Sequence, residues 1–198
     1  MNKHWCVVLG LLGSAACNTG PAEDQAAGQQ PVVVDSILPI EIALHRFREG
    51  LQEVARLTSG APTRDALVAE LATGLAHSDT LALERLAVTR AEYAWLYYPT
   101  TAIARPPYEL PPALAWFQLQ EGNRKGALRL LRDLGGRTND LLGYSCAADP
   151  MTERDNRIWT GCLVELRVDG GPASQQRLFA AILERDGQFA FLSFHNDF

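Results

Sequence analysis

The sequence predicts an α+β domain whose N-terminal helices pack on an antiparallel sheet of three to four strands from its C-terminal part. Apolar residues recur at spacings of three and four between residues 40 and 134, which is the period of amphipathic helices. After Gly136 they alternate with polar residues, as in half-buried strands. Asp186-Gly187 lies between two apolar runs and is typical of a two-residue hairpin turn. Helices followed by hairpin-connected strands indicate the α+β class.

Three helices are predicted in the first half of the domain. The first covers residues 38–57 and ends before Gly60, because its apolar residues share one face up to that point. Thr63 fits the N-cap of a second helix, which stops near His77. Asp79 fits the N-cap of a short third helix. Each of the three has an apolar stripe that can pack on the sheet.

A short fourth helix is predicted to begin at Arg90. Thr89 and Glu92 fit the capping-box pattern, in which the hydroxyl and the carboxylate bind each other's backbone N–H groups. Pro99 ends the helix by about Tyr98, because the residue before a proline avoids the helical conformation. A helix this short is not stable alone, so its stability must come from tertiary packing.

Aromatic residues and prolines are concentrated between residues 89 and 112. Aromatic side chains fall on both sides of the short helix, so we expect Tyr93 in the core with apolar partners around it. The alternative is an aromatic cage that binds a ligand. The proline-rich segment 99–112 is expected to be a stiff, extended loop at the rim of any pocket.

Two more helices are predicted between residues 112 and 134. Pro112 fits the first turn of one helix, and Gly122 is expected to close it. Asn123 then fits the N-cap of another helix, which Gly135 ends. The sequence therefore predicts a break in the middle of this region.

The strands follow, with segment 149–157 between them as a solvated loop of mixed charge. They are predicted over residues 141–146, 158–168, 177–185 and 188–195. A two-residue turn at Asp186-Gly187 fixes the register of the last two strands. The expected pairs are Leu183 with Ala190, Ile182 with Phe191, Ala181 with Leu192, Phe179 with Phe194, and Leu178 with His195. Both faces of this hairpin are mostly apolar, so we expect other elements to cover both.

Residues 1–16 are predicted to be an export signal peptide, because a positive start precedes a short apolar run. That run is far shorter than the about 20 residues that span a bilayer, so no transmembrane anchor is predicted. Residues 17–36 are rich in Gln, Ala, Gly and Pro and are predicted to be a flexible tether. A single domain over residues 37–198 is expected after it.

Cys17 follows Ser14-Ala15-Ala16, which resembles the bacterial lipobox with a serine where leucine is usual. This pattern predicts a lipoprotein that is acylated at Cys17 and held on a membrane of the cell envelope. The same residues also suit ordinary signal peptidase. In that alternative the protein is soluble and is secreted or periplasmic.

Export would leave Cys146 and Cys162 in an oxidising compartment, where a disulfide between them would contribute about 3 kcal/mol. The alternative is two separate buried thiols. No CxxC motif occurs and no cysteine has a histidine neighbour, so neither a metal nor a cofactor is predicted. The formal net charge is −5, which gives no basic field to attract nucleic acid.

The order of elements also resembles the nuclear transport factor 2-like superfamily of α+β cones. The segments that carry the resemblance are 64-RDALVAELATGLAHSDTLALERLA-87, WTGCLVELRV, QRLFAAILER and QFAFLSFHNDF. It covers residues 62–198 and leaves the 38–57 helix as an addition. The resemblance implies a curved sheet that folds around a hydrophobic cavity, on a fold that hosts both enzymes and non-catalytic modules.

No GxSxG, Walker, GxGxxG or HExxH motif occurs, so the candidate ligand-binding residues come from the expected cavity. Tyr97 and Tyr98 could donate hydrogen bonds to a ligand, Arg105 could bind an anion, and Tyr108 lies beside it on the proline-rich loop. His195 could act as a general acid or base. Each also has a purely structural explanation. Two functions stay open: a non-catalytic module that binds a small apolar ligand or a protein, and a small cavity enzyme of the isomerase, dehydratase or hydrolase type.

Overall fold

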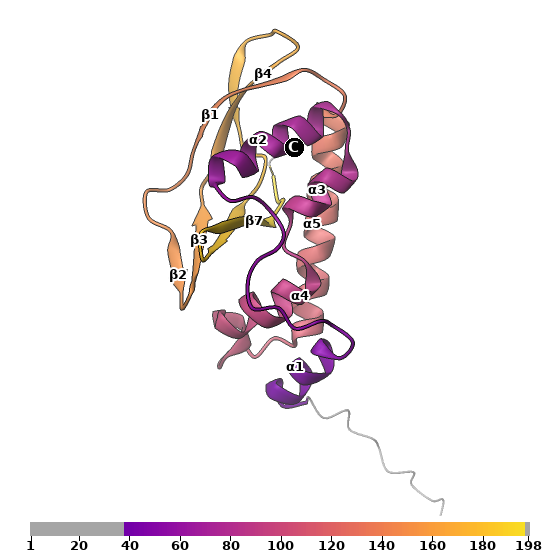
Figure 1. Cartoon of the computed structure of the whole chain (residues 1–198), viewed down its shortest axis with the longest axis vertical. Coiled ribbons are helices and arrows are strands. Elements are labelled where there is room, and N and C mark those ends of the chain that lie inside the picture. Colours follow the sequence, from indigo (N-terminus) through magenta and orange to yellow (C-terminus); the bar gives the residue numbers. More distant parts are fainter. Residues whose placement is uncertain (1–37, 197–198) are drawn as a thin grey trace, which may run out of the picture. The chain divides into compact units, whose positions relative to one another are not determined.

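Helices precede strands along residues 38–196, which is the part of the chain that the computed structural model describes (Figure 1). The α-helices are α1 (Ile40–Arg48), α2 (Arg64–Ala76), α3 (Thr80–Leu86), α4 (Arg90–Glu92) and α5 (Pro112–Leu134). A π-helical turn, η1 (Tyr93–Tyr97), and two 3-10 turns, η2 (Tyr98–Thr100) and η3 (Ala102–Ala104), follow α4. The strands are β1 (Asn139–Ser145), β2 (Met151–Glu153), β3 (Asn156–Thr160), β4 (Leu163–Val168), β5 (Ala173–Gln176), β6 (Ala181–Arg185) and β7 (Gln188–Ser193). The predicted α+β class is confirmed.

The strands form two antiparallel sheets, with the orders β1-β4-β5 and β2-β3-β6-β7. The prediction of one strand over residues 158–168 is wrong. Gly161 has a φ of +64°, a left-handed conformation that interrupts the strand there. As a result, β3 ends at Thr160 in the four-stranded sheet and β4 begins at Leu163 in the three-stranded sheet.

Cys146 and Cys162 form a disulfide, as predicted. Cys146 follows β1 of the three-stranded sheet, and Cys162 lies between β3 and β4. The bond therefore closes the loop that carries the β2–β3 hairpin, beside the point where the chain passes from one sheet to the other. The alternative of two separate thiols is excluded.

The β6–β7 hairpin has the predicted turn, because Asp186 and Gly187 have φ values of +51° and +75°. Leu183 pairs with Ala190 and Ile182 with Phe191, as expected. A register shift between Ala181 and Ile182 then breaks the predicted pattern, and Ala181 pairs with Ser193 rather than with Leu192. Because β6 begins only at Ala181, the predicted pairs of Leu178 and Phe179 do not form.

Two other predictions about the strand region are wrong. Part of the segment 149–157 is not a solvated loop, because β2 and the start of β3 pair there as a hairpin. Asn156 in β3 is fully buried, and its Nδ2 donates to the Leu96 carbonyl at 2.9 Å and to Thr100 Oγ1 at 3.0 Å. β5 was not predicted, since its polar sequence lacks the apolar alternation of a half-buried strand.

The N-caps Thr63, Asp79 and Thr89 are confirmed, but the predicted length of the first helix is wrong. α1 ends at Arg48, not at residue 57, because Gly50 takes a left-handed conformation with a φ of +75°. Arg48 is held there by hydrogen bonds of 3.1 and 3.0 Å to the Ala94 carbonyl and by stacking on Trp95. The proline-rich segment 99–112 also differs from the prediction, since it includes the end of η2 and all of η3.

α5 runs without a break through Gly122 and Asn123, where a boundary was predicted. Asn123 does not cap a helix: its Nδ2 donates to the Leu192 carbonyl at 3.1 Å, and its Oδ1 accepts from the Phe194 N–H at 2.8 Å. A Cβ atom on Gly126 would lie 1.9 Å from the Phe194 carbonyl oxygen. The glycine therefore lets the α5 backbone approach the chain directly after β7.

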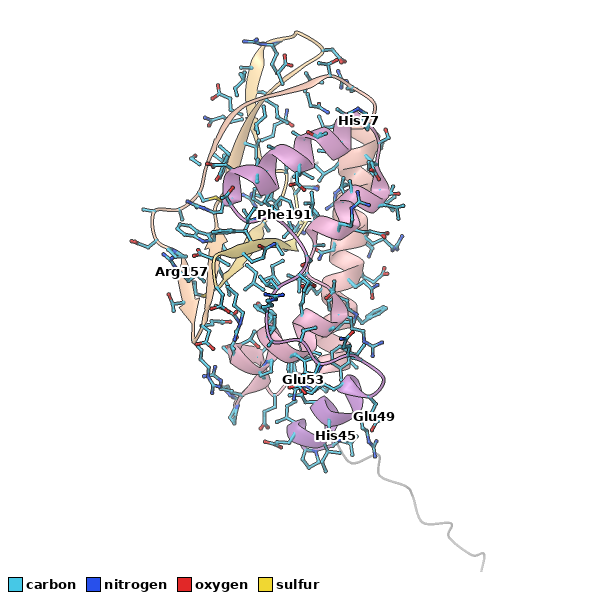
Figure 2. All side chains as sticks on the ribbon, in the orientation of Figure 1. His45, Glu49, Glu53, His77, Arg157 and Phe191 are labelled. Carbon is cyan, nitrogen blue, oxygen red and sulfur yellow. A yellow bond between two sulfur atoms is a disulfide. The ribbon has the colours of Figure 1, made fainter. Side chains whose placement is uncertain are left out.

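Two clusters of buried apolar side chains cover the two faces of the β6–β7 hairpin. Ile182 and Phe191 belong to the first cluster, whereas their neighbours Leu183 and Ala190 belong to the second. The first cluster also contains residues of α2, α3 and the C-terminal half of α5, and Figure 2 labels its member Phe191, which lies on β7. The second contains residues of α1, α4–η2 and the N-terminal half of α5. The expectation that both faces are covered is confirmed.

Candidate functional site

A groove lies between α3 and α5, which run beside each other in Figure 1. Its volume is about 380 Å³. Half of its sixteen lining residues are apolar, and they come from both helices, from the segment after α3 and from the C-terminal segment: Leu83, Ala87, Val88, Trp116, Ala127, Leu128, Leu131 and Phe194. Leu128 is also 53% exposed, so an apolar surface continues from the groove to the outside.

Both walls of the groove are attached to β7 and the residue that follows it. On one side Val88 donates its N–H to the Phe191 carbonyl at 3.0 Å. On the other side Asn123 binds the backbone of Leu192 and Phe194. The groove lies between these two attachments, one made by the Val88 backbone and the other by the Asn123 side chain.

Four charged residues line the groove, and two of them neutralise each other. Arg124 Nη2 lies 3.0 Å from a carboxylate oxygen of Glu121, and this hydrogen bond holds the pKa of Glu121 below its usual value. The other two, Glu84 and Arg90, take part in no ion pair among the residues that the structure describes. The Arg90 guanidinium lies 4.7 Å over the Phe47 ring.

The groove has two different ends. At one end the C-terminus of α5 meets the turn before α3, where the Gly136 N–H donates to the Leu75 carbonyl at 3.0 Å. Thr80 and Leu131 lie toward this end. At the other end the Trp116 ring lies 5.1 Å from the Tyr93 ring, three residues after Arg90. The unpaired cation therefore belongs to the Trp116 end.

The capping box at the start of α4 fixes the Arg90 end of the groove. Glu92 is completely buried, and its carboxylate accepts six hydrogen bonds. The donors are Thr58 N (2.6 Å) and Oγ1 (3.0 Å), Ser59 N (2.8 Å) and Oγ (2.7 Å), and Thr89 N (2.8 Å) and Oγ1 (2.9 Å). Burial opposes the charge on Glu92, but these hydrogen bonds outweigh it and hold its pKa below the usual value.

The five residues predicted as ligand contacts do not line this groove. Tyr98 is fully buried and donates its hydroxyl to the Leu110 carbonyl at 2.5 Å, so it anchors the proline-rich segment. Arg105 is exposed and donates to the Thr100 carbonyl, and Tyr108 is 69% exposed. His195 is exposed and does not lie on the apolar face where it was expected, because β7 ends at Ser193.

Tyr97 is half-buried, packs against the second apolar cluster and lies close enough to Glu153 to be affected by its charge. Burial, and then the nearby Glu153 carboxylate, raise the pKa of Tyr97 to about 12. Burial also raises the pKa of Glu153, against the opposing effects of the Ala102 N–H and of Arg105. Oε2 of Glu153 is buried without a hydrogen-bond partner in the described residues.

Residues 38–196 contain neither a cluster of metal ligands nor a membrane-spanning helix. No group of three or more histidine, cysteine, aspartate or glutamate side chains there is arranged to hold a metal ion. No helix there combines the length and the apolar character that crossing a bilayer requires. The predicted signal peptide, the tether and Cys17 lie outside the described residues.

We found no match to this chain among known family models, curated proteins or solved structures. The interpretation of the site therefore rests on its own geometry. Sequence reasoning missed the groove, and the sequence has no clear signal for it: Thr80, Leu83 and Ala87 repeat with a helical period, but Leu83 belongs to the buried core.

Proposed function

We propose that this protein is a non-catalytic binding protein of the cell envelope whose domain holds a small apolar ligand in the α3–α5 groove. The observation that supports this function is the groove itself: it has a volume of about 380 Å³ and a largely apolar surface, to which eight apolar and eight polar residues contribute. Small-molecule sites in proteins have this composition and volumes of about 300–1,000 Å³. Transfer of apolar ligand surface from water into such a site contributes about 25 cal/mol per Å².

The envelope location is part of the same proposal. Support comes from the leader-like residues 1–16 and from Cys17 after a lipobox-like sequence. Incorporation of labelled palmitate by cells that express the chain is the test, with Cys17→Ser as the control. We expect label in the parent chain and none in the variant. Absence of label from both would favour the soluble secreted or periplasmic alternative.

The ligand-binding proposal is tested by titrating the non-acylated Cys17→Ser chain with decanol in a calorimeter. We expect saturable binding that Leu128→Glu weakens at least tenfold, because the variant puts a charge into the apolar lining. Leu81→Glu is the matched control: Leu81 is 62% exposed on α3 but does not line the groove. Equal affinities for the two variants, or no saturable binding, would contradict the proposal.

A cavity enzyme is the second candidate, and the pair Tyr97–Glu153 is the observation that favours it. A carboxyl group with a raised pKa beside a phenol has the composition of an acid–base pair. Co-purified or added carbonyl compounds that are turned over by the parent chain, but not by Glu153→Gln, would support this candidate. The nuclear transport factor 2-like resemblance also stays a proposal, supported by the order of helices before antiparallel strands.

A further inference from the structure

We propose that the ligand of the groove is a single-chain amphiphile with an anionic head group, and that Arg90 binds this head group. The inference rests on the proposed function and gives its ligand a chemical class. A carboxylate head and a phosphate head share the required chemistry, and the experiment below separates them. Three features of the groove carry the inference: an unpaired cation, an orientation and a volume.

The first feature is the state of Arg90. Its guanidinium is held over the Phe47 ring at 4.7 Å, and no carboxylate pairs with it among the described residues. Stacking of this kind orients a guanidinium without using its N–H donors. The donors stay free for a planar carboxylate or a phosphate, which arginine binds through two parallel hydrogen bonds. The Arg124 side chain differs from that of Arg90, because it already donates two hydrogen bonds to the Glu121 carboxylate.

The second feature is the orientation of the groove. Arg90 lies at the end beside Trp116, whereas Leu128 and Leu131 line the part toward the C-terminus of α5. A ligand with its head at Arg90 would place its apolar chain along Leu128 and Leu131. Glu84, on α3, follows Thr80 by one helical turn and so lies between the two ends. Its negative charge repels an anionic head from the middle and favours the Arg90 end.

The third feature is the size of the groove. A volume of about 380 Å³ is near the lower limit for ligand sites, which favours one hydrocarbon chain over the two chains of a membrane lipid. The exposed Leu128 marks where a longer chain would leave the groove. The structure thus combines an apolar channel for one chain with a single unpaired cation at one end, within the part of the protein that it describes.

The test compares four ligands of equal chain length on the Cys17→Ser chain: decanoate, decyl phosphate, decanol and decyltrimethylammonium, all below their aggregation concentrations. At pH 7 and low salt we expect decanoate or decyl phosphate to bind about tenfold more tightly than decanol, as for one charge-assisted hydrogen-bonded contact. Whichever of the two anions binds more tightly identifies the head group. Added salt should reduce the difference, because the Arg90 side chain is exposed.

Three substitutions separate the head-group claim from the groove itself. Arg90→Gln should remove the preference for the anions over decanol, whereas Arg90→Lys should keep a reduced preference and so control for loss of folding. Arg46→Gln removes an exposed arginine of α1 outside the groove and should change nothing. Equal binding of decanol and the anions, or a preference for decyltrimethylammonium, overturns the role of Arg90. If none of the four ligands binds, or if Leu128→Glu has no effect on decanol, the proposed function itself fails.

Discussion

The two halves of α5 contact very different surroundings. Its N-terminal half packs in the aromatic cluster around Tyr93, where four aromatic rings lie within 5.1–6.1 Å of the Tyr93 ring centre. Its C-terminal half forms one wall of the groove together with Trp116 of the N-terminal half, and Leu128 is half exposed there. Within the cluster, Tyr98 turns its hydroxyl inward to the Leu110 carbonyl. At the groove, Arg90 has no such partner among the described residues.

The aromatic cluster is therefore already buried by contacts within the fold, whereas the groove is still accessible to a ligand. A ring that is surrounded by other rings has no contact area left for a ligand. An apolar lining with an unpaired charge at its edge has both contact area and hydrogen-bonding capacity left. The aromatic residues concentrated between residues 89 and 112 therefore do not mark the candidate site, which Trp116 and Phe194 line instead.

The largest expected effect is that of removing the centre of the aromatic cluster. Tyr93→Ala should lower the free energy of unfolding by about 3–5 kcal/mol, because Tyr93 is 1% exposed and packs on four rings. Urea denaturation of the parent chain and of the variant measures this loss in the free energy of unfolding. Phe117→Ala on α5 is the control: its ring is 58% exposed, so the change should stay within about 0.5 kcal/mol. A loss below about 1 kcal/mol for Tyr93→Ala would return the aromatic cage to consideration.

Glu92→Gln should have the next largest effect, since it perturbs the hydrogen bonds that hold Thr58, Ser59 and Thr89. We expect a loss of about 2–3 kcal/mol at pH 7, because an amide cannot accept all six hydrogen bonds. The folded-state pKa of Glu92 is lowered, so its stabilising effect is complete above the ordinary value of 4.5 and is lost as the pH falls below it. Denaturation curves at pH 7 and below pH 4 should therefore differ less for the variant than for the parent chain.

Two alanine substitutions on α5 should change the stability of the protein in opposite directions. Gly126→Ala forces a Cβ into the Phe194 carbonyl and should destabilise the protein by about 1–3 kcal/mol, with a change in groove width that alters ligand affinity. Gly122→Ala has no neighbour within 4 Å and should stabilise the helix by about 0.5–1 kcal/mol. Thermal unfolding of both variants is the measurement. If both substitutions changed the stability in the same direction, α5 would not approach the segment after β7 as described.

The smallest effect is expected at Glu153. Burial raises its folded-state pKa, so its ionised form destabilises the protein once the pH rises above the ordinary value of 4.5. Glu153→Gln should therefore raise the stability at pH 7, by no more than about 0.5 kcal/mol, and have no effect at pH 4. This pH dependence is opposite to that of Glu92. A destabilised variant at pH 7 would show that the carboxylate makes a contact that outweighs its burial.

Features that depend on a few neighbouring residues were predicted well. The N-caps Thr63, Asp79 and Thr89 each accept the expected backbone hydrogen bond, and the turn at Asp186-Gly187 has the expected conformation. Each of these is a contact between residues at most three positions apart, so the local sequence contains all the information that decides it.

Features that depend on distant residues were not predicted. Gly122 and Asn123 read locally as a helix boundary, but the Asn123 side chain binds the backbone more than 60 residues away and the helix continues. The groove was missed for the same reason, because its walls come from α3 and α5 and its gap exists only once both are attached to β7. Local propensity gives way to tertiary contacts in both cases.

The six hydrogen bonds to Glu92 also affect the hydrogen exchange that we expect for the segment before α2. Residues 58–61 lie outside the helices and extended strands, yet all four of their N–H groups are bonded: two to Glu92, one to the Arg85 carbonyl and one to the Phe189 carbonyl. Amide protons in such a segment exchange with solvent only when these contacts open together. The amide protons of residues 58–61 should therefore be among the most slowly exchanging in the protein, although this segment has the appearance of a loop.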